Sequence, residues 1–196
     1  MAPATPDVPT RDRILFAAAE LFRRQGYAAT GLNQIVHASD ASFGSIYHFF
    51  PGGKEQLGDD VIRVAGEFFR RLYVSIAQAS PDAPGAIEAF FAGAAQTLRD
   101  TDYADACPIA TVALEVASTN EALRRATADV FESWLAEVEG TLTGAGADEA
   151  EARRLALALL ALLEGAFMLS RALRSTEPMD AGAQAAVALV EGALRE

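Results

Sequence analysis

Residues Thr30–Leu57 read TGLNQIVHASDASFGSIYHFFPGGKEQL and contain two short apolar-periodic segments on either side of a break at residues 39–41. The second segment opens at Ser42, a good helix N-cap, and closes at Pro51 and the two glycines behind it, which stop a helix. Two short helices joined by a tight turn are typical of a helix-turn-helix, which places one helix in the major groove of DNA. The apolar positions are Leu32, Ile35 and Val36 in the first segment, and Phe43, Ile46, Tyr47 and Phe50 in the second.

A supporting helix is predicted directly before this pair. Residues 11–25 read RDRILFAAAELFRRQ, with Thr10 as the expected N-cap and Gly26 at the position that follows a helix end. Two short helices cannot bury a core alone, so a helix-turn-helix needs this third element. Its expected apolar face consists of Ile14, Ala18, Leu21 and Phe22.

These motifs resemble those of the TetR family of bacterial repressors. Over residues 10–62 the chain contains I-L-x-A-A-x-x-L-F-x-x-x-G-Y-x-x-T, then I-V, then S-x-G-S-I-Y-x-x-F and K-E-x-L. The variant P-G-G-K-E-Q-L, together with C-P-I-A-T-V-A-L-E-V-A at Cys107–Ala117, looks like the LmrA/YxaF-like branch of that family. The resemblance implies a DNA-binding head followed by a helical domain that binds a ligand and dimerises.

The rest of the chain is also predicted to be helical. No alternating strand pattern persists in these 196 residues, of which 51% are hydrophobic. We therefore expect an all-α protein with an N-terminal three-helix helix-turn-helix domain and a helical C-terminal ligand-binding and dimerisation domain. The expected divisions are a disordered arm at residues 1–9, the DNA-binding domain at 10–53, and the ligand-binding and dimerisation domain at 54–196. The expected helices of the last part are residues 54–79, 86–99, 108–117, 121–142, 148–173 and 180–194.

The net charge of −11 at first argues against a nucleic-acid-binding protein. Residues 1–63, however, carry six basic and seven acidic side chains, whereas residues 64–196 carry ten basic and twenty acidic ones. Within residues 10–54, five basic side chains stand against three acidic ones. The distribution of charge matters more than its sum, and it leaves a weakly positive head that can make a few phosphate contacts.

Several other classes of protein are disfavoured. The single cysteine, Cys107, excludes an intramolecular disulfide and fits a reducing cytoplasm. The longest apolar run, Leu155–Leu163, is too short to span a bilayer, and the N-terminus does not read as a signal peptide, so we expect a cytoplasmic protein without a membrane partner. His37, His48 and Cys107 have no metal-binding spacing and form no catalytic constellation. We expect no metal, no cofactor and no enzymatic activity.

The recognition helix and its surroundings supply the expected DNA contacts. Side chains at the start and on the face of this helix would read base edges, and Gly44 would let the backbone approach the DNA closely. The alternative for Phe43 and Tyr47 is that they only pack the head. The expected contacts at the recognition helix are Ser42, Phe43, Gly44, Ser45, Tyr47 and His48, and the expected phosphate contacts are Thr30, Gly31, Asn33, Gln34 and Lys54.

Two positions depart from the family pattern. Gly31 stands where a capping Thr or Ser is common, and Gly is a weaker cap. The turn reads Ser-Asp-Ala rather than Ala-Gly-Val, so Asp40 must adopt the turn conformation, which Asp tolerates better than most residues do.

Glu115 and Glu164 are carboxylates within apolar helices, in V-A-L-E-V-A and A-L-L-E-G-A. A carboxylate buried alone is costly, so each needs a partner or a role. One interpretation places them in a ligand pocket; the alternatives are a solvent-facing helix or a pair with an arginine such as Arg171. The expected pocket residues are Phe68, Phe91, Tyr103, Cys107, Thr111, Glu115, Trp134, Glu164, Phe167 and Met168.

The apolar pattern of the last two expected helices indicates that two copies of the chain associate. Residues 148–173 are apolar nearly all round, which requires burial against two neighbours, and residues 181–194 carry an apolar stripe. The resemblance implies dimerisation through these helices as a four-helix bundle; the alternative is that both pack within the monomer. We expect a homodimeric, ligand-responsive repressor that binds double-stranded, pseudo-palindromic operator DNA and is released by a small hydrophobic or aromatic effector. The alternative function is a helical small-molecule-binding protein without specific DNA binding.

Overall fold

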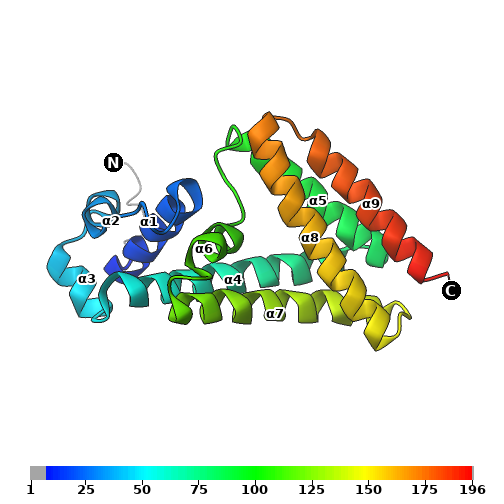
Figure 1. The fold of residues 1–196 in the computed structure, drawn as a ribbon, viewed down its shortest axis with the longest axis horizontal. Coiled ribbons are helices and arrows are strands. Elements are labelled where there is room, and N and C mark those ends of the chain that lie inside the picture. Colours follow the sequence, from blue (N-terminus) through cyan, green and yellow to red (C-terminus); the bar gives the residue numbers. More distant parts are fainter. Residues whose placement is uncertain (1–7, 196) are drawn as a thin grey trace, which may run out of the picture.

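The computed structural model describes residues 8–195, which form nine α helices and no strand (Figure 1). This confirms the all-α prediction. Most of the predicted N-terminal arm, residues 1–7, lies outside the described part of the chain. The helices are α1 (Thr10–Gln25), α2 (Leu32–Ser39), α3 (Phe43–Phe49), α4 (Gly53–Ala79), α5 (Ala83–Asp100), α6 (Pro108–Val116), α7 (Glu121–Gly144), α8 (Glu149–Leu173) and α9 (Glu177–Ala193).

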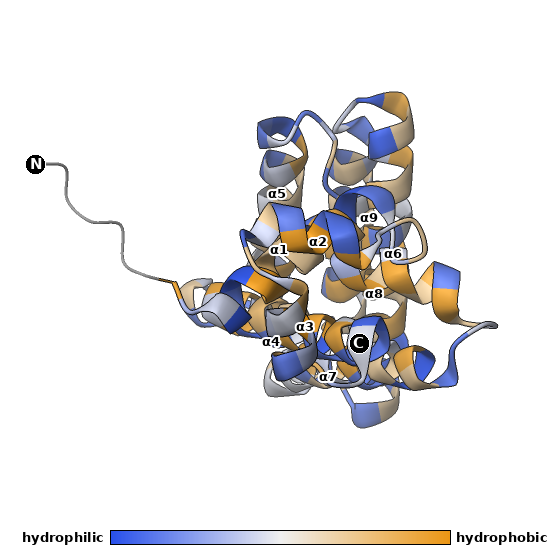
Figure 2. Ribbon diagram, turned by 90° about the vertical axis from the view of Figure 1, so that its left-hand side faces the viewer, coloured by the Kyte–Doolittle hydropathy of each residue, from blue (hydrophilic) through white to orange (hydrophobic). Residues whose placement is uncertain are grey.

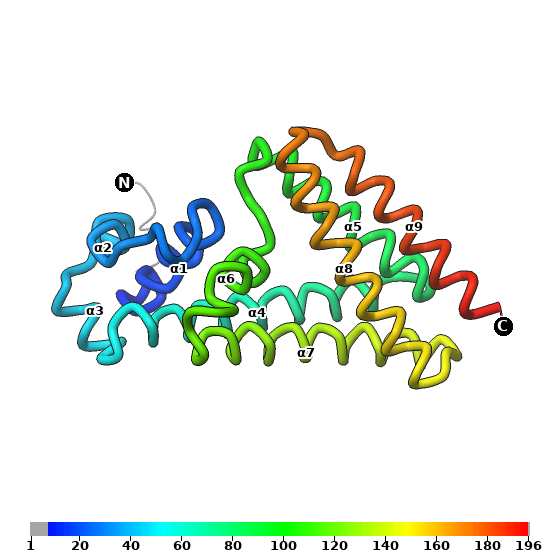
Figure 3. The backbone as a smooth tube through the Cα atoms, viewed as in Figure 1, coloured from blue at the N-terminus to red at the C-terminus, as the bar shows by residue number. Residues whose placement is uncertain are grey.

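The helices form a head and a body, and two long helices of the body reach the head. Helices α1–α3 form the head at one end, and α4 and α7 run side by side away from it (Figures 1 and 3). Helices α5, α8 and α9 pack together at the other end. The short helix α6 lies between head and body and contacts α1, α4 and α7. Hydrophobic and hydrophilic residues alternate along most helices in Figure 2, the pattern of helices with one buried face.

Local capping explains where the head helices begin and end. The Ser42 hydroxyl accepts a hydrogen bond from the Ser45 backbone N at 3.0 Å, as its N-cap prediction requires. Asp40 adopts the left-handed conformation with φ 48°, which confirms the predicted turn. Gly31 caps α2 without a side chain, but the Gln34 amide oxygen accepts a hydrogen bond from the Gly31 backbone N at 2.8 Å.

Three predicted helix starts are wrong. Thr10 lies inside α1, and Pro9 occupies the N-cap position instead. Helix α5 begins at Ala83, three residues earlier than expected, because Asp82 caps it through the Gly85 backbone N at 2.8 Å. Pro178 was expected in a break but lies in the first turn of α9, where the N–H that proline lacks has no partner within the helix anyway.

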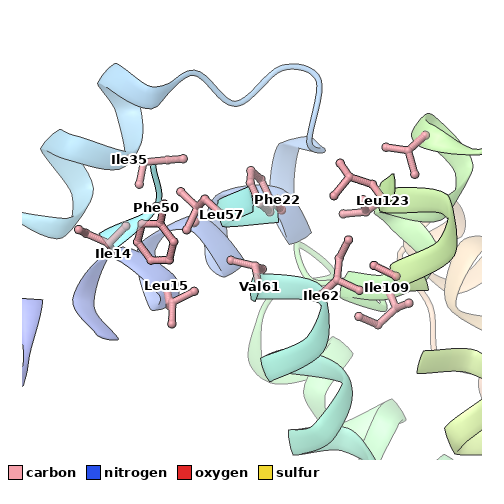
Figure 4. Packing of buried hydrophobic residues seen from close by; sticks show 14 of the residues in the cluster. Ile14, Leu15, Phe22, Ile35, Phe50, Leu57, Val61, Ile62, Ile109 and Leu123 are labelled. Atoms are coloured by element: carbon pink, nitrogen blue, oxygen red, sulfur yellow. The ribbon is translucent and has the colours of Figure 1, made fainter. Parts of the chain in front are cut away.

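The core of the head extends into the body. Side chains of α1, α2 and the end of α3 pack in the same cluster as residues of α4, α6 and α7 (Figure 4). Phe22 and Phe50 are fully buried there, together with Leu57 from α4 and Leu123 from α7. The head is therefore held to the body by apolar packing as well as by the chain.

A second cluster fills the body around α8. Leu155, Leu159 and Leu163 of α8 are buried among residues of α5, α7 and α9. Helix α8 is long and apolar enough to cross a membrane by length and composition alone, a test that core helices also pass. Other apolar side chains of α8 and α9 point outward. They are Leu157, Met168, Leu169, Leu173 and Leu189.

Helices α4 and α7 pack closely at Gly66, which suggests a stability test. A Cβ at this position would lie 2.6 Å from the methyl carbons of Val130. Gly66→Ala must push the helices apart, and we expect a loss of about 1–3 kcal/mol in the free energy of unfolding, measured in urea. The control Gly140→Ala, with no neighbouring atom within 4 Å, should instead stabilise α7 by about 0.5–1 kcal/mol. Equal effects of the two substitutions would contradict this account.

Candidate nucleic-acid interface and ligand cavity

Helix α3 presents an exposed face at the end of the head. Ile46 and Phe50 are buried in the head core, whereas Phe43 and Tyr47 are 44% and 53% exposed. Ser42, Gly44 and His48 are exposed beside them, and Ser45 is half-buried with its hydroxyl 2.9 Å from that of Ser42. Phe43 and Tyr47 are therefore not confined to the core of the head. The six expected recognition residues all lie within residues 42–48, around the buried Ile46, and their contact with DNA stays a prediction.

The structure corrects the expectation for Thr30. Its side chain is fully buried, and its hydroxyl donates a hydrogen bond to the Gly26 carbonyl at 2.7 Å. It also accepts a hydrogen bond from the Gln25 side-chain amide at 3.1 Å. Thr30 holds the turn between α1 and α2, so its hydroxyl is not available to a phosphate. Gly31, Asn33 and Gln34 remain exposed at the start of α2.

Lys54 folds over the same turn. Its Nζ atom lies 4.2 Å from the centre of the Tyr27 ring and donates a hydrogen bond to the Ala28 carbonyl at 3.5 Å. Partial burial lowers the pKa of Lys54, and the negative charge of Glu115 acts in the opposite direction. A phosphate contact by Lys54 stays a prediction, and its ammonium group would have to leave the Tyr27 ring to extend further.

Glu115 lies at the joint between head and body rather than in the cavity. Its carboxylate accepts a hydrogen bond from the Ala28 backbone N at 2.6 Å, across 87 residues of sequence. A Cβ at Gly26 would lie 1.8 Å from the other carboxylate oxygen, and Gly26 has a φ of 88°. Glycine thus leaves space for the carboxylate, which fixes α6 to the turn between α1 and α2. The expected pocket role of Glu115 is corrected.

A cavity of about 350 Å³ lies within the body, between α4, α5, α7 and α8. Its wall is mostly apolar and includes the start of α6 and the segment before it. The sequence did not single out Phe69, Tyr73 and Phe90 as lining residues, although helical spacing places Tyr73 one turn after Phe69. Of the expected pocket residues, the structure brings together Phe91, Cys107, Trp134, Glu164 and Phe167.

The remaining expected pocket residues lie outside this cavity. Phe68 and Met168 are 61% and 64% exposed on the outer faces of α4 and α8. Tyr103 precedes α6, with the Arg174 guanidinium over its ring at 5.9 Å. The Thr111 hydroxyl donates a hydrogen bond to the Cys107 carbonyl at 2.9 Å. The helices are apolar on more than one side, so the sequence alone did not show which side faces the cavity.

An ion pair connects the cavity wall to the head. Asp105 is buried, with one carboxylate oxygen 3.0 Å from Arg23 Nη2 and the other 3.6 Å from Arg24 Nε. Both arginines stand in the last turn of α1, and Arg23 and Asp105 both line the cavity. Arg171 of α8 donates hydrogen bonds to the carbonyls of residues 103 and 104 in the same segment, at 3.3 and 3.2 Å. Arg171 therefore binds the backbone of this segment and forms no ion pair with Glu115 or Glu164.

Glu164 is the unusual polar group of the cavity. Burial raises the pKa of its carboxyl group to about 7, and a hydrogen bond with the Cys107 thiol offsets this only in part. Its Oε1 atom is buried and has no hydrogen-bond partner among the described residues. Burial also raises the pKa of the Cys107 thiol well above its usual value, which keeps this thiol protonated and poorly nucleophilic.

Comparisons with known proteins identify two family domains in this chain. The family model described as "Bacterial regulatory proteins, tetR family" matches residues 14–61. The model described as "Transcriptional regulator LmrA/YxaF-like, C-terminal domain" matches residues 83–185. The first covers the head, and the second covers most of the cavity wall.

Relatives match over nearly their whole length. The uncharacterized HTH-type transcriptional regulator YxaF of Bacillus subtilis is 37% identical over 170 residues, which cover 87% of this chain and 89% of the relative. The HTH-type transcriptional regulator LmrA of the same organism is 33% identical over 170 residues, 87% of this chain and 90% of the relative. These families and relatives are transcriptional regulators and not enzymes.

Solved structures share the fold. A TetR transcriptional regulator from Legionella pneumophila superimposes with a TM-score of 0.82 at 23% identity, covering 96% of this chain and 98% of the other. A regulatory protein TetR from Rhodobacter sphaeroides gives 0.83 at 20% identity, covering 92% and 98%. With the head, the cavity and the two family matches together, the chain belongs to the TetR family of bacterial transcriptional regulators, in its LmrA/YxaF-like branch.

Proposed function

We propose that this regulator is a cytoplasmic, homodimeric repressor that leaves its operator when a small hydrophobic or aromatic effector enters the cavity. The observation that carries the proposal is the Asp105 ion pair. Asp105 and Arg23 belong to the cavity wall, and Arg23 also belongs to α1 of the head. An effector that displaces either side chain acts directly on the position of the head.

The exposed face of α3 supports DNA recognition. Phe43 and Tyr47 are available for base or phosphate contact because the core of the head is filled by other residues. In a dimer, two such helices would enter successive major grooves about 34–36 Å apart, so the operator would be pseudo-palindromic. The acidic body gives DNA no general attraction, so affinity would depend on the correct spacing of both heads.

The outward apolar side chains of α8 and α9 support the dimer. Leu169 and Leu173 lie near the end of α8, and Leu189 lies on α9, all exposed in the single chain. Helices α8 and α9 pack against each other, so two copies of this pair would form a four-helix bundle. Burial of these apolar side chains would then fix the distance between the heads.

Effector release requires a difference in affinity. The effector can lower DNA binding only if it binds the DNA-free arrangement more tightly than the DNA-bound one. The linked elements are α4, which begins in the head and lines the cavity, and the segment 101–107, which carries Asp105. The alternative is a helical small-molecule-binding protein without specific DNA binding. Such a protein would give no shift in a gel-shift assay with the DNA that flanks its own gene.

Tyr47→Ala tests the recognition face. Because Tyr47 is half exposed, its truncation should leave the melting temperature nearly unchanged. Specific operator affinity should fall by about 5–150-fold, which corresponds to a lost contact of roughly 1–3 kcal/mol. Fluorescence anisotropy with the operator measures this change, and Phe68→Ala, which truncates another exposed aromatic side chain outside the head, is the control. Unchanged operator affinity of Tyr47→Ala would place the recognition surface elsewhere.

Leu189→Arg tests the assembly. The substitution places a charge in the proposed apolar bundle, which costs several kcal/mol as an order of magnitude. Sedimentation should show folded monomers at micromolar concentration, and operator binding should be lost with the dimer. Leu114→Arg is the matched control, since Leu114 is 85% exposed on α6. A dimer of undiminished stability in Leu189→Arg would exclude this interface.

Asp105→Asn tests the connection between cavity and head. It keeps the shape of the side chain and removes the charge that holds Arg23 and Arg24. An effector found by thermal-shift screening should lower the operator affinity of the wild-type protein by about 5–150-fold. In Asp105→Asn, the ratio of operator affinities without and with the effector should move towards one. Asp102→Asn, which alters an exposed ion pair with Arg174 in the same segment, is the control. An unaltered ratio in Asp105→Asn would mean that the signal takes another route.

A further inference from the structure

The wall of the cavity has an excess of one negative charge. Three carboxylates line it, namely Asp105, Glu137 and Glu164. They stand against two guanidinium groups, those of Arg23 and Arg70, and the lining includes no lysine or histidine. One of these carboxylates therefore lacks a compensating charge within the wall.

Both guanidinium groups are already paired. Arg23 pairs with Asp105 at 3.0 Å. Arg70 pairs with Glu137, and also with Glu67 on its own helix at 2.7 Å. Glu164 takes part in no ion pair within the described residues, so the uncompensated charge belongs to Glu164.

The surroundings of Glu164 offer it little else. Its Oε1 atom is buried without a hydrogen-bond partner among the described residues, and the neighbouring polar group is the neutral Cys107 thiol. An unpaired carboxylate removed from water is costly. Two partners can relieve this cost: a proton, which the raised pKa of Glu164 already favours, or a cation brought by a ligand.

The aromatic lining favours the cation. The faces of aromatic rings attract positive charge through their quadrupole. The Trp134 indole N–H donates to the Gly66 carbonyl at 2.8 Å, so this ring offers a ligand its surface and not a hydrogen-bond donor. Six aromatic residues line the cavity: Phe69, Tyr73, Phe90, Phe91, Trp134 and Phe167.

We propose that the cavity selects aromatic ammonium compounds, in which a protonated amine pairs with the Glu164 carboxylate and the ring system packs among the aromatic side chains. The volume of about 350 Å³ suits a compact molecule, such as one with two fused rings. The regulatory consequence rests on the function proposed above, but the selectivity itself does not require DNA.

The test uses three naphthalene probes of similar shape: 1-naphthylmethylammonium, neutral 1-naphthylmethanol and anionic 1-naphthoate. Calorimetric titration of the wild-type protein at pH 7.5 should show the cation binding at least tenfold more tightly than the alcohol, and the anion most weakly. Glu164→Gln keeps the shape and removes the charge, so the preference for the cation should disappear while the alcohol still binds. Glu149→Gln, an exposed change on the same helix, should retain the wild-type order.

The pH dependence supplies a second readout. With a pKa of about 7, Glu164 is mostly protonated at pH 6 and mostly ionised at pH 8. Affinity for the cation should therefore rise about tenfold over this range, while affinity for the alcohol should not rise. Burial raises the pKa of Cys107 and of Tyr73, so both stay neutral over this range. The other charged groups of the wall are the ion-paired Arg23, Asp105, Arg70 and Glu137.

Several outcomes would overturn the proposal. They are equal binding of the three probes, a preference for the alcohol or the anion, no binding of any probe, or a full cation preference in Glu164→Gln. A gel shift with the operator then distinguishes the ligand selectivity of the cavity from its role in regulating DNA binding. If the cation binds through Glu164 without weakening operator binding, the selectivity is supported and the effector role of the cavity is refuted.

Discussion

The apolar packing of the head against α6 and the two long helices is the constraint on which the remaining structure depends. A head of three short helices has too little surface to bury a core of its own. It completes its core with side chains such as Leu57 from α4, Ile109 from α6 and Leu123 from α7. The orientation of α3 is therefore fixed by the body, and a displacement of α6 cannot leave the head unaffected.

Polar contacts add direction to this packing at the two ends of α6. Near its start, Asp105 holds the end of α1 at the cavity wall. Near its end, Glu115 holds the turn between α1 and α2 through the Ala28 backbone N. Apolar contacts are not directional and do not by themselves fix the position of the head against α6. The directional contacts of Asp105 and Glu115 at the two ends of α6 define that position. The cavity thus lies beside one of the two contacts that position the head.

The parts of the structure that follow from local chemistry could be predicted from the sequence. The capping serine at position 42 and the left-handed turn at Asp40 depend on neighbouring residues only, and both predictions are confirmed. The polar contacts between head and body could not be predicted, because Glu115 bonds a residue 87 positions away and no local pattern marks Asp105. For the cavity, the sequence identified Glu164 as an isolated carboxylate, but helices that are apolar on several sides concealed which aromatic residues face inward.

The hydrogen bond between Trp134 and the Gly66 carbonyl gives the protein an intrinsic optical reporter. Trp134 is the single tryptophan of the chain, its indole N–H contacts the backbone of α4, and its ring lines the cavity. Indole emission shifts in wavelength with the polarity and hydrogen bonding around the ring. The emission of this one residue would therefore report both the binding of a ligand in the cavity and a separation of α4 from α7. Both could be followed in a rapid-mixing instrument without a dye.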